Sequence, residues 1–174
     1  MGNTVGSWNK TSLKNLSRTT QAFIAGFLEG DGCISARITP TSGSYRVLIV
    51  IGFTQRQEGR AVLEYLSQFL HEPIADYRMR NMSELLVRDR AKVAFLLHQL
   101  LPFLVSKKKQ AELALQVIEI LERSKRGERR TAKNLLEAVR LAEQIRSLNS
   151  NRRDKIVHTL QAVQHRLRER GFVS

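Results

Sequence analysis

The spacing of apolar residues changes along the chain, and each spacing predicts a type of element. Around residues 22–28 and 57–71, apolar side chains recur every three or four positions, which predicts amphipathic helices. Residues 33–39 and 45–54 instead alternate apolar and polar side chains and are rich in β-branched residues, which predicts strands. Residues 40–44 form a turn signal between these strands, so we expect an antiparallel hairpin.

The second half of the chain has a mostly helical pattern. A second, shorter hairpin is expected from residues 76–80 and 84–89. Four helices are then expected, at residues 91–101, 107–124, 131–148 and 154–170. The order is αββαββα with further helices appended, which is an α+β pattern. Residues 1–17 are polar and rich in Gly, Ser, Asn and Thr, so we predict a flexible N-terminal arm followed by a single domain at 18–174.

The first predicted helix contains glycines that an isolated helix would not favour. Thr19 and Thr20 are candidate N-caps, and Gly26 and Gly30 lie four positions apart, so both glycines fall on one face. Each glycine costs roughly 1 kcal/mol in helix propensity relative to alanine. Such a cost is understandable where a second backbone approaches closely. The glycines therefore predict a close helix contact.

Two carboxylates lie at the end of the same helix. Glu29 and Asp31 are near its C-terminus, where the helix dipole disfavours negative charge by about 0.3–1 kcal/mol. A carboxylate in this position, beside a glycine-lined face, suggests a cationic partner. A simpler interpretation stays open, in which Asp31 and Gly32 form a turn between the helix and the next strand.

The charge of the chain narrows the class of partner. The 174 residues include 29 Lys and Arg against 16 Asp and Glu, a formal net charge of +13. An excess of this size predicts a polyanionic partner such as nucleic acid. Anionic membrane is the rival partner, but no apolar run approaches the roughly 18 residues needed to span a bilayer. The single cysteine, Cys33, has no intrachain disulfide partner, and no Cys/His cluster has the spacing of a zinc site.

Residues 23–32, Phe-Ile-Ala-Gly-Phe-Leu-Glu-Gly-Asp-Gly, resemble the signature helix of the LAGLIDADG homing endonucleases, and the resemblance extends over about residues 20–160. One copy of the signature is present, which is similar to the homodimeric branch of the family. The resemblance implies the family fold, an αββαββα core with a curved antiparallel DNA-binding sheet and C-terminal helices. It also implies that two signature helices pack together at a dimer interface, through Ala22, Gly26 and Gly30.

The resemblance further implies a metal-dependent active site. Asp31 would be the catalytic, metal-binding carboxylate, with the backbone carbonyl of Gly30 as a further ligand. The implied metal is Mg²⁺, with Mn²⁺ expected to substitute, because hard cations prefer oxygen ligands and a sparse site lets Mg²⁺ keep its waters. Gln55 would order a water, and Lys107, the first of three consecutive lysines, would be the catalytic lysine of the active site.

One catalytic position departs from the family pattern. Where the family usually has Arg or Lys near the scissile phosphate, this chain has Gly59, with Arg60 beside it. Either Arg60 substitutes as the catalytic basic residue through a small backbone shift, or that contact is lost. The departure mildly favours a protein that binds nucleic acid without cleaving it.

Strand alternation defines an outer face of the predicted sheet, and the resemblance implies that this face binds DNA. The predicted DNA-binding residues of the two hairpins are Ser35, Arg37, Thr39, Thr41, Arg46, Leu48, Arg78, Arg80, Glu84, Leu86 and Arg88. Arginine can bind guanine bidentately, and glutamate can accept from cytosine N4. A merely solvated face is the alternative. Leu48, Val50 and Gly52 would either contact thymine methyl groups or be partly covered.

Two further groups complete the prediction. Phosphate contacts at the flank of the DNA site are expected between the last two helices, from Asn151, Arg152 and Arg153. Met79 and Met82 are expected to pack against other residues rather than to take part in chemistry.

The sequence therefore predicts a homodimeric, Mg²⁺-dependent endonuclease that makes double-strand breaks in a long pseudo-palindromic DNA site and starts group I intron homing. The alternatives are an RNA maturase or a non-cleaving DNA-binding protein on the same fold, and a non-specific nucleic-acid coat. Asp31, Gln55 and Lys107 together favour the nuclease. We expect no membrane and no small-molecule cofactor. No transit peptide is visible, so we expect expression within an organelle, chloroplast or mitochondrion, or else in a bacterial cytoplasm.

Overall fold

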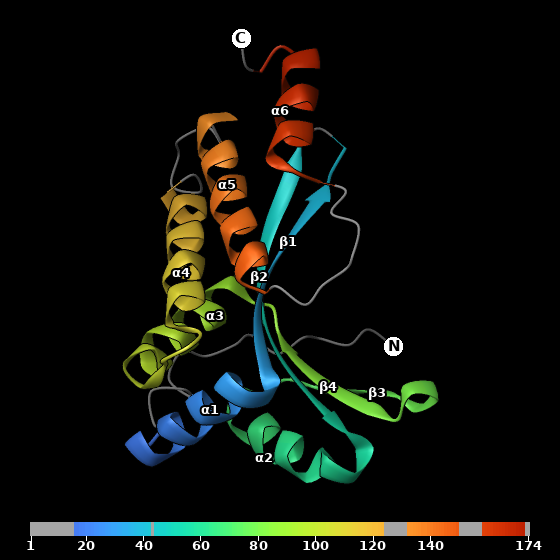
Figure 1. Cartoon of the computed structure of the whole chain (residues 1–174), viewed down its shortest axis with the longest axis vertical. Coiled ribbons are helices and arrows are strands. Elements are labelled where there is room, and N and C mark those ends of the chain that lie inside the picture. Colours follow the sequence, from blue (N-terminus) through green and yellow to red (C-terminus); the bar gives the residue numbers. More distant parts are fainter. Residues whose placement is uncertain (1–15, 43, 124–131, 150–157, 173–174) are drawn as a thin grey trace, which may run out of the picture.

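The computed structural model describes residues 16–42, 44–123, 132–149 and 158–172, and it confirms the α+β order αββαββα (Figure 1). The elements are α1 (Arg18–Asp31), β1 (Gly32–Pro40), β2 (Tyr45–Arg56), α2 (Arg60–Leu70), β3 (Ile74–Tyr77), β4 (Met82–Val87), α3 (Arg90–Leu100), α4 (Lys108–Arg123), α5 (Ala132–Leu148) and α6 (Leu160–Glu169). Short 3₁₀ turns lie at Gln57–Gly59, Arg78–Arg80 and Leu101–Phe103. Within the described ranges, none of the helices is long and apolar enough to cross a membrane.

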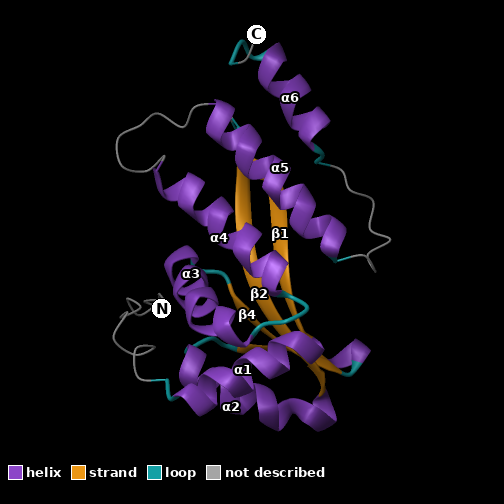
Figure 2. Cartoon of the chain, turned by 60° about the vertical axis from the view of Figure 1, so that its left-hand side comes forward, coloured by secondary structure: helices purple, strands orange, loops and turns teal. Residues whose placement is uncertain are grey.

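The four strands form one antiparallel sheet in the order β1-β2-β4-β3. The β1–β2 hairpin is much longer than the β3–β4 pair and projects beyond it, and α4 and α5 pack along the projecting part (Figures 1 and 2). Helix α6 lies at the tip of this hairpin, where the Arg170 guanidinium donates to the carbonyl oxygen of Ser42 at 3.2 Å. Helices α1 and α2 lie at the other end of the molecule.

The two faces of the sheet differ as the alternation predicts. The inner face is apolar, and its buried side chains are Ile34, Ala36, Ile38, Val47, Ile49, Ile51 and Phe53. They pack in one core with buried residues of the helices, such as Ile24 and Leu28 of α1. On the outer face, Arg37 and Arg46 are exposed. The fold thus leaves a basic strand surface on the side away from the core.

Helix α1 begins earlier than the sequence analysis predicts. Ser17, in extended conformation, is the N-cap, and its hydroxyl oxygen accepts from the backbone N–H of Thr20 at 3.1 Å. Thr19 and Thr20 are therefore inside the helix and are not caps. Leu16 is buried in the core. The folded part thus includes the last two residues assigned to the N-terminal arm, whose other residues lie outside the described ranges.

The chain passes from α1 directly into β1 at Gly32. Its backbone N–H donates to the carbonyl oxygens of Leu28 and Phe27, which closes the helix. A Cβ at this position would lie 2.7 Å from Leu28 Cδ1 and 2.8 Å from Leu28 Cα, so a side chain has no room. Because glycine permits this junction without a loop, Asp31 is the last residue of the helix and is followed immediately by the strand.

The tip of the β3–β4 hairpin corrects part of the strand prediction. β3 ends at Tyr77, and Arg78 and Arg80 lie in a 3₁₀ turn, so they do not share a strand face. Asn81 ends the turn in the left-handed conformation (φ 51°), which asparagine tolerates better than most residues. The Asn81 amide donates to Glu58 Oε1 at 2.7 Å. Met79, expected to pack, is fully exposed at this tip.

The outer edge of β1 is covered by the end of α5. The Asn149 amide donates to the carbonyl oxygen of Ile34 at 2.8 Å, and Arg146 Nε donates to that of Ala36 at 3.1 Å. These bonds satisfy two carbonyl groups that an edge strand would otherwise expose. Burial lowers the pKa of Arg146 from its usual value, against an opposing effect of Glu143. Helix α5 is thereby fastened to the strand that carries Ser35 and Arg37.

Candidate active site and nucleic-acid interface

Asp31 and Gln55 meet where the end of α1 lies beside the end of β2. The Gln55 side-chain amide donates to Asp31 Oδ2 at 2.7 Å, and the Asp31 side chain is otherwise exposed. Two residues that are 24 positions apart in the chain are thus brought together, as the sequence analysis expects of an active site. The bond orients the amide, because a carboxylate accepts only from its NH₂ group.

Gly59 lies on the other side of the Gln55 amide. A Cβ built on Gly59 would lie 2.9 Å from Gln55 Oε1, which is closer than real Cβ atoms come. A side chain at position 59 therefore requires the Gln55 amide to move, and that amide is bound to Asp31. The glycine that departs from the family pattern thus gives Gln55 the space for its present orientation.

Glu29 binds the segment that leads into α4. Its carboxylate accepts from the backbone N–H groups of Val105, Ser106 and Lys107, each at 3.0 Å, and from the Ser106 hydroxyl. In return, the Lys107 ammonium donates to the backbone carbonyl oxygen of Glu29. The sequence analysis suggested a cationic partner for this carboxylate. The partner is instead a row of amide groups at a helix N-terminus, where a negative charge is favourable.

These hydrogen bonds lower the pKa of the Glu29 carboxyl group. Burial raises its pKa, but the Ser106 side chain and the three backbone N–H groups outweigh it and lower the pKa from 4.5 to about 2. Because the folded pKa is below the unfolded one, the stabilisation is complete above pH 4.5 and is lost as the pH falls toward 2. Glu29→Gln is expected to lower the free energy of unfolding by about 1–2 kcal/mol at neutral pH, after allowance for solvent screening.

The measurement is urea denaturation of both proteins across the acid range. The difference in unfolding free energy should narrow steadily below pH 4.5. A difference that stayed constant down to acid pH would show that the carboxylate charge does not stabilise the fold.

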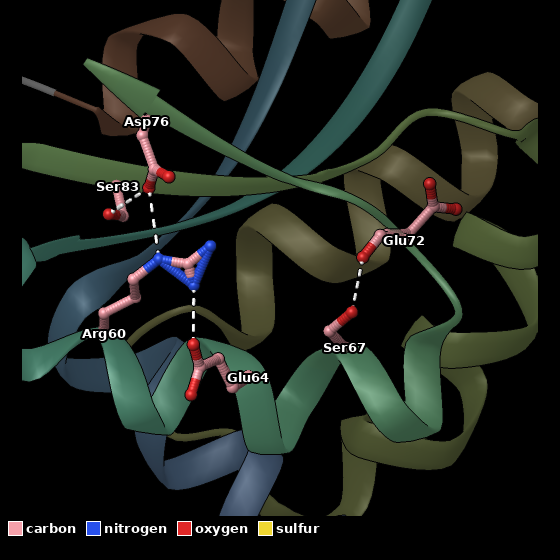
Figure 3. Close-up of polar contacts among 6 residues, drawn as sticks. All are labelled: Arg60, Glu64, Ser67, Glu72, Asp76 and Ser83. Atoms are coloured by element: carbon pink, nitrogen blue, oxygen red, sulfur yellow. Dashed lines mark hydrogen bonds and ion pairs between the residues drawn. The ribbon is translucent and has the colours of Figure 1, made fainter. Parts of the chain in front are cut away.

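Arg60, the candidate replacement for the missing basic residue, is bound to carboxylates of α2 and β3 (Figure 3). Its guanidinium donates to Glu64 Oε1 at 2.7 Å and to Asp76 Oδ1 at 3.3 Å, and the Ser83 hydroxyl also donates to Asp76. Arg60 thus joins α2 to β3. Both ion pairs are partly exposed, so each is worth less than about 1 kcal/mol. Its catalytic role stays a prediction and requires the guanidinium to leave both partners.

The glycine face of α1 is open in the single chain. Ala22, Gly26 and Gly30 are exposed, and nothing lies within 4 Å of a Cβ built on either glycine. Phe23, 43% exposed, packs edge-on against Tyr65 of α2, 41% exposed, with ring centroids 5.4 Å apart. The sequence analysis missed this aromatic pair, because contacts between different helices leave no local pattern. An open small-residue face flanked by exposed aromatic rings is typical of a surface that another chain covers.

The oxygen donors at the end of α1 are of the kind that a hard divalent cation prefers. In the part of the chain that the structure describes, no three His, Cys, Asp or Glu side chains gather to hold a metal. Asp31 supplies one carboxylate, and Gly30 lies in the last helical turn, whose carbonyl groups lack partners within the helix. Mg²⁺ usually binds through one or two carboxylates and keeps several waters, so this sparse donor set suits it.

The outer face carries most of the predicted DNA-binding residues. Arg37, Thr39, Arg46 and Arg88 are exposed, and Ser35, Leu48, Glu84 and Leu86 are half-buried. Thr41 closes the β1–β2 turn, where its hydroxyl accepts from the backbone N–H of Ser44 at 3.1 Å. The role of each of these residues, and of Arg78 and Arg80, in DNA binding stays a prediction. Asn151, Arg152 and Arg153 lie outside the described residues.

Three outer-face residues were missed. The Tyr77 hydroxyl donates to Glu84 Oε2 at 3.2 Å and so orients that carboxylate. Thr54 lies directly opposite Glu84 on β2, and Arg56 is exposed two residues further along. Thr54 lies within the strand predicted at residues 45–54, and its alternation, continued two residues further, would also have identified Arg56.

The apolar part of the outer face is covered. Val50 is fully buried, and a Cβ on Gly52 would lie 2.9 Å from Leu86 Cδ2 and 3.1 Å from Cys33 Sγ. Of the two alternatives left open, partial cover is therefore correct for Val50 and Gly52. Leu48 stays half-buried, so part of its side chain is accessible.

Comparisons with known proteins agree with this geometry. The family model of the LAGLIDADG endonucleases matches residues 24–116, more than half of the chain. The DNA endonuclease I-CvuI of Chlorella vulgaris is 30% identical over 139 residues, which cover 78% of this chain and 83% of that protein. The DNA endonuclease I-CreI of Chlamydomonas reinhardtii is 30% identical over 153 residues, which cover 85% and 90%.

The similarity extends to three dimensions. The crystal structure of I-CvuI in complex with its target superimposes with a TM-score of 0.79 at 27% identity, over 90% of this chain and 98% of that one. The matched family model covers the part of α1 from residue 24 onward, with its glycines and Asp31, as well as Gln55 and Lys107. The chain belongs to the LAGLIDADG endonuclease family.

Proposed function

We propose that this protein is a homodimeric, Mg²⁺-dependent homing endonuclease that cleaves both strands of a long, pseudo-palindromic DNA site. The observation that carries the proposal is the exposed Asp31 carboxylate, bound to the Gln55 amide at the end of a helix whose glycine face is open. Membership of the family supports a nuclease activity, since the relatives I-CvuI and I-CreI are named DNA endonucleases. The net charge of +13 is suited to a DNA partner.

The proposal of a homodimer is based on the number of catalytic carboxylates that one chain supplies. One chain has a single signature helix and offers one Asp31, whereas cleavage of both strands needs an acid for each. Packing two copies of α1 through Ala22, Gly26 and Gly30 would bring two Asp31 side chains together near the two-fold axis. The exposed Phe23 and Tyr65 would then become part of the same interface.

In the proposed reaction, a water attacks the scissile phosphorus while the bond to the leaving oxygen breaks. Asp31 and the Gly30 carbonyl would hold Mg²⁺, which when bound supplies a Lewis acid for the negative charge that develops on the phosphate. The Gln55 amide donates to Asp31, and its carbonyl oxygen, on the side of Gly59, would accept a hydrogen bond from the attacking water and orient it. The Lys107 ammonium would donate to a phosphate oxygen.

Sequence recognition would use the outer face. Exposed arginines such as Arg37 and Arg46 are suited to guanine, and Glu84, oriented by the Tyr77 hydroxyl, is suited to cytosine N4. Phosphate contacts from Arg152 and Arg153 would add affinity without sequence information. The base that each side chain contacts would depend on the nucleotide sequence of the target.

The proposed biological role is the homing of a group I intron in an organelle. Both curated relatives come from algae, Chlorella and Chlamydomonas, which supports a chloroplast or mitochondrial setting. A bacterial cytoplasm is the alternative setting.

A pooled library of candidate intron-insertion sites tests the proposed activity. The protein is incubated with the library in Mg²⁺, Mn²⁺, Ca²⁺ or EDTA, and broken ends are sequenced. Discrete double-strand cuts are expected with Mg²⁺ and Mn²⁺, and no cuts with EDTA. Target-specific retention without cutting in any metal would instead assign the protein to the DNA-binding class. Gly59 and the engaged Arg60 favour that second function.

A further inference from the structure

Lys107 and Asp31 are joined through a residue to which the proposed mechanism gives no role. We infer that Glu29 is a positioning residue, which locks Lys107 onto the end of α1 and so sets its place relative to Asp31. The inference rests on the proposed function, because it concerns the lysine that would act on the phosphate.

The contact is a reciprocal cap between two helices. The Glu29 carboxylate binds the N–H groups that precede α4, with Oε1 accepting from Val105 and Lys107 and Oε2 accepting from Ser106. The Lys107 ammonium binds the Glu29 carbonyl oxygen in the last turn of α1. The Glu29 carboxylate therefore binds the backbone N–H groups that lead into α4, and the Lys107 ammonium binds a carbonyl group at the end of α1. The contact between the two segments requires both the Glu29 carboxylate and the Lys107 ammonium.

Packing alone does not hold the segment that carries Lys107. Leu104 is buried and anchors its beginning, and Gln110 is buried in the first turn of α4. Between them, Val105 is 85% exposed and Ser106 is also exposed, so these side chains are not held by the core. The backbone here is fixed by the bonds to Glu29, together with the bond from the Ala111 N–H to the Lys107 carbonyl oxygen. Because Glu29 is only two residues before Asp31, they fix it relative to the proposed metal site.

The chemistry of glutamine makes Glu29→Gln a sharp test. The substitution keeps the length of the side chain but turns one acceptor oxygen into a donor NH₂ group, which would face a backbone N–H. At least one of the bonds to residues 105–107 must then be lost, together with the negative charge. A misplacement of about 1 Å can cost roughly 100-fold in rate, so we expect kcat to fall by about 10- to 100-fold.

A double-mutant cycle with Lys107→Gln separates positioning from general stability. Single-turnover cleavage of the target found in the library is measured for both single variants and the double variant. If Glu29 acts through Lys107, Glu29→Gln should lower kcat in the wild-type background but by less than about threefold in the Lys107→Gln background. Target binding in Ca²⁺ should change by less than about threefold in every variant. Glu29→Asp should restore part of the rate, because it keeps the charge.

Ser17→Ala is the matched control. It removes the cap at the other end of α1, at a cost of about 1 kcal/mol, and leaves the Glu29–Lys107 contact intact. Its kcat should equal that of the wild type. A cleavage defect in Ser17→Ala as large as that in Glu29→Gln would show that Glu29 only stabilises the fold. So would equal effects of Glu29→Gln in both backgrounds.

Amide hydrogen exchange tests the contact without any cleavage. The N–H groups of residues 105–107 should exchange at least about tenfold faster in Glu29→Gln than in wild type, and unchanged in Ser17→Ala. Unchanged exchange in Glu29→Gln would overturn the inference, even where the wild type cleaves DNA. A wild type that cleaves nothing, combined with faster exchange, would overturn only the proposed function.

Discussion

Asp31→Asn is expected to abolish cleavage while leaving target binding intact. Asparagine keeps the size of the side chain, and its carbonyl oxygen can still accept from the Gln55 amide, so the local geometry should persist. What is lost is the negative charge that would hold Mg²⁺. Charge stabilisation by such a metal is worth several kcal/mol, so single-turnover cleavage should fall by about 1,000-fold or more. Binding in Ca²⁺, measured by gel shift, should change by less than about tenfold, because the proposed base contacts come from the outer face of the sheet, whereas Asp31 lies at the end of α1.

Asp89→Asn provides a control with the same chemical change. Asp89 caps α3 through a bond from the backbone N–H of Lys92 to its carboxylate at 2.9 Å. Its substitution should cost about 1 kcal/mol of stability or less and should leave the cleavage rate unchanged. If Asp31→Asn cleaved as fast as Asp89→Asn, Asp31 would have no part in the chemistry.

Gly26→Leu should separate the fold from the dimer. In the single chain nothing lies within 4 Å of a Cβ at position 26, so the monomer can accept the side chain. Leucine also favours a helix over glycine by about 0.5–1 kcal/mol, so the monomer should not lose stability. In a dimer both copies carry the extra bulk, and overpacking costs about 1–3 kcal/mol at each site. The dimer dissociation constant should therefore rise by roughly 30- to 20,000-fold.

Light scattering after size exclusion measures the change in mass, and circular dichroism checks the fold. Double-strand cleavage at nanomolar protein should be lost together with the dimer. Gln116→Leu adds the same side chain at an exposed position of α4 and should stay dimeric and active. A Gly26→Leu protein that remained a dimer would place the interface on another surface.

Residues near one another in the sequence were predicted well. The alternation of β1 and β2 has a period of two, so it sets the buried and exposed faces whatever the surroundings, and Ile34 and Arg37 lie as expected. The prediction failed where a local turn replaces the strand, as at Arg78 and Arg80. There the strand stops at Tyr77, and the left-handed Asn81, bound to Glu58, ends the turn that follows.

Contacts between distant segments could not be predicted. The bonds from Glu29 to residues 105–107 span 76 to 78 positions of the chain, and no pattern around Glu29 indicates them. The same holds for Arg60, whose sequence neighbours do not reveal Asp76 as a partner. Gln55 and Asp31 were assigned to one site only because the chain resembles a family in which such residues act together.

The direct junction of α1 and β1 at Gly32 would fix the distance between the proposed cleavage site and the proposed recognition surface. No loop separates Asp31 from the strand that carries Ser35, Arg37 and Thr39, so a continuous backbone would set the distance from the proposed cut to the proposed base contacts. A strand advances about 3.3 Å per residue, close to the 3.4 Å between nucleotides of one DNA strand, and side chains on one face are two residues apart. In the proposed complex, successive contacts would therefore address roughly every second base pair, and the break would fall at a constant offset from the recognised sequence.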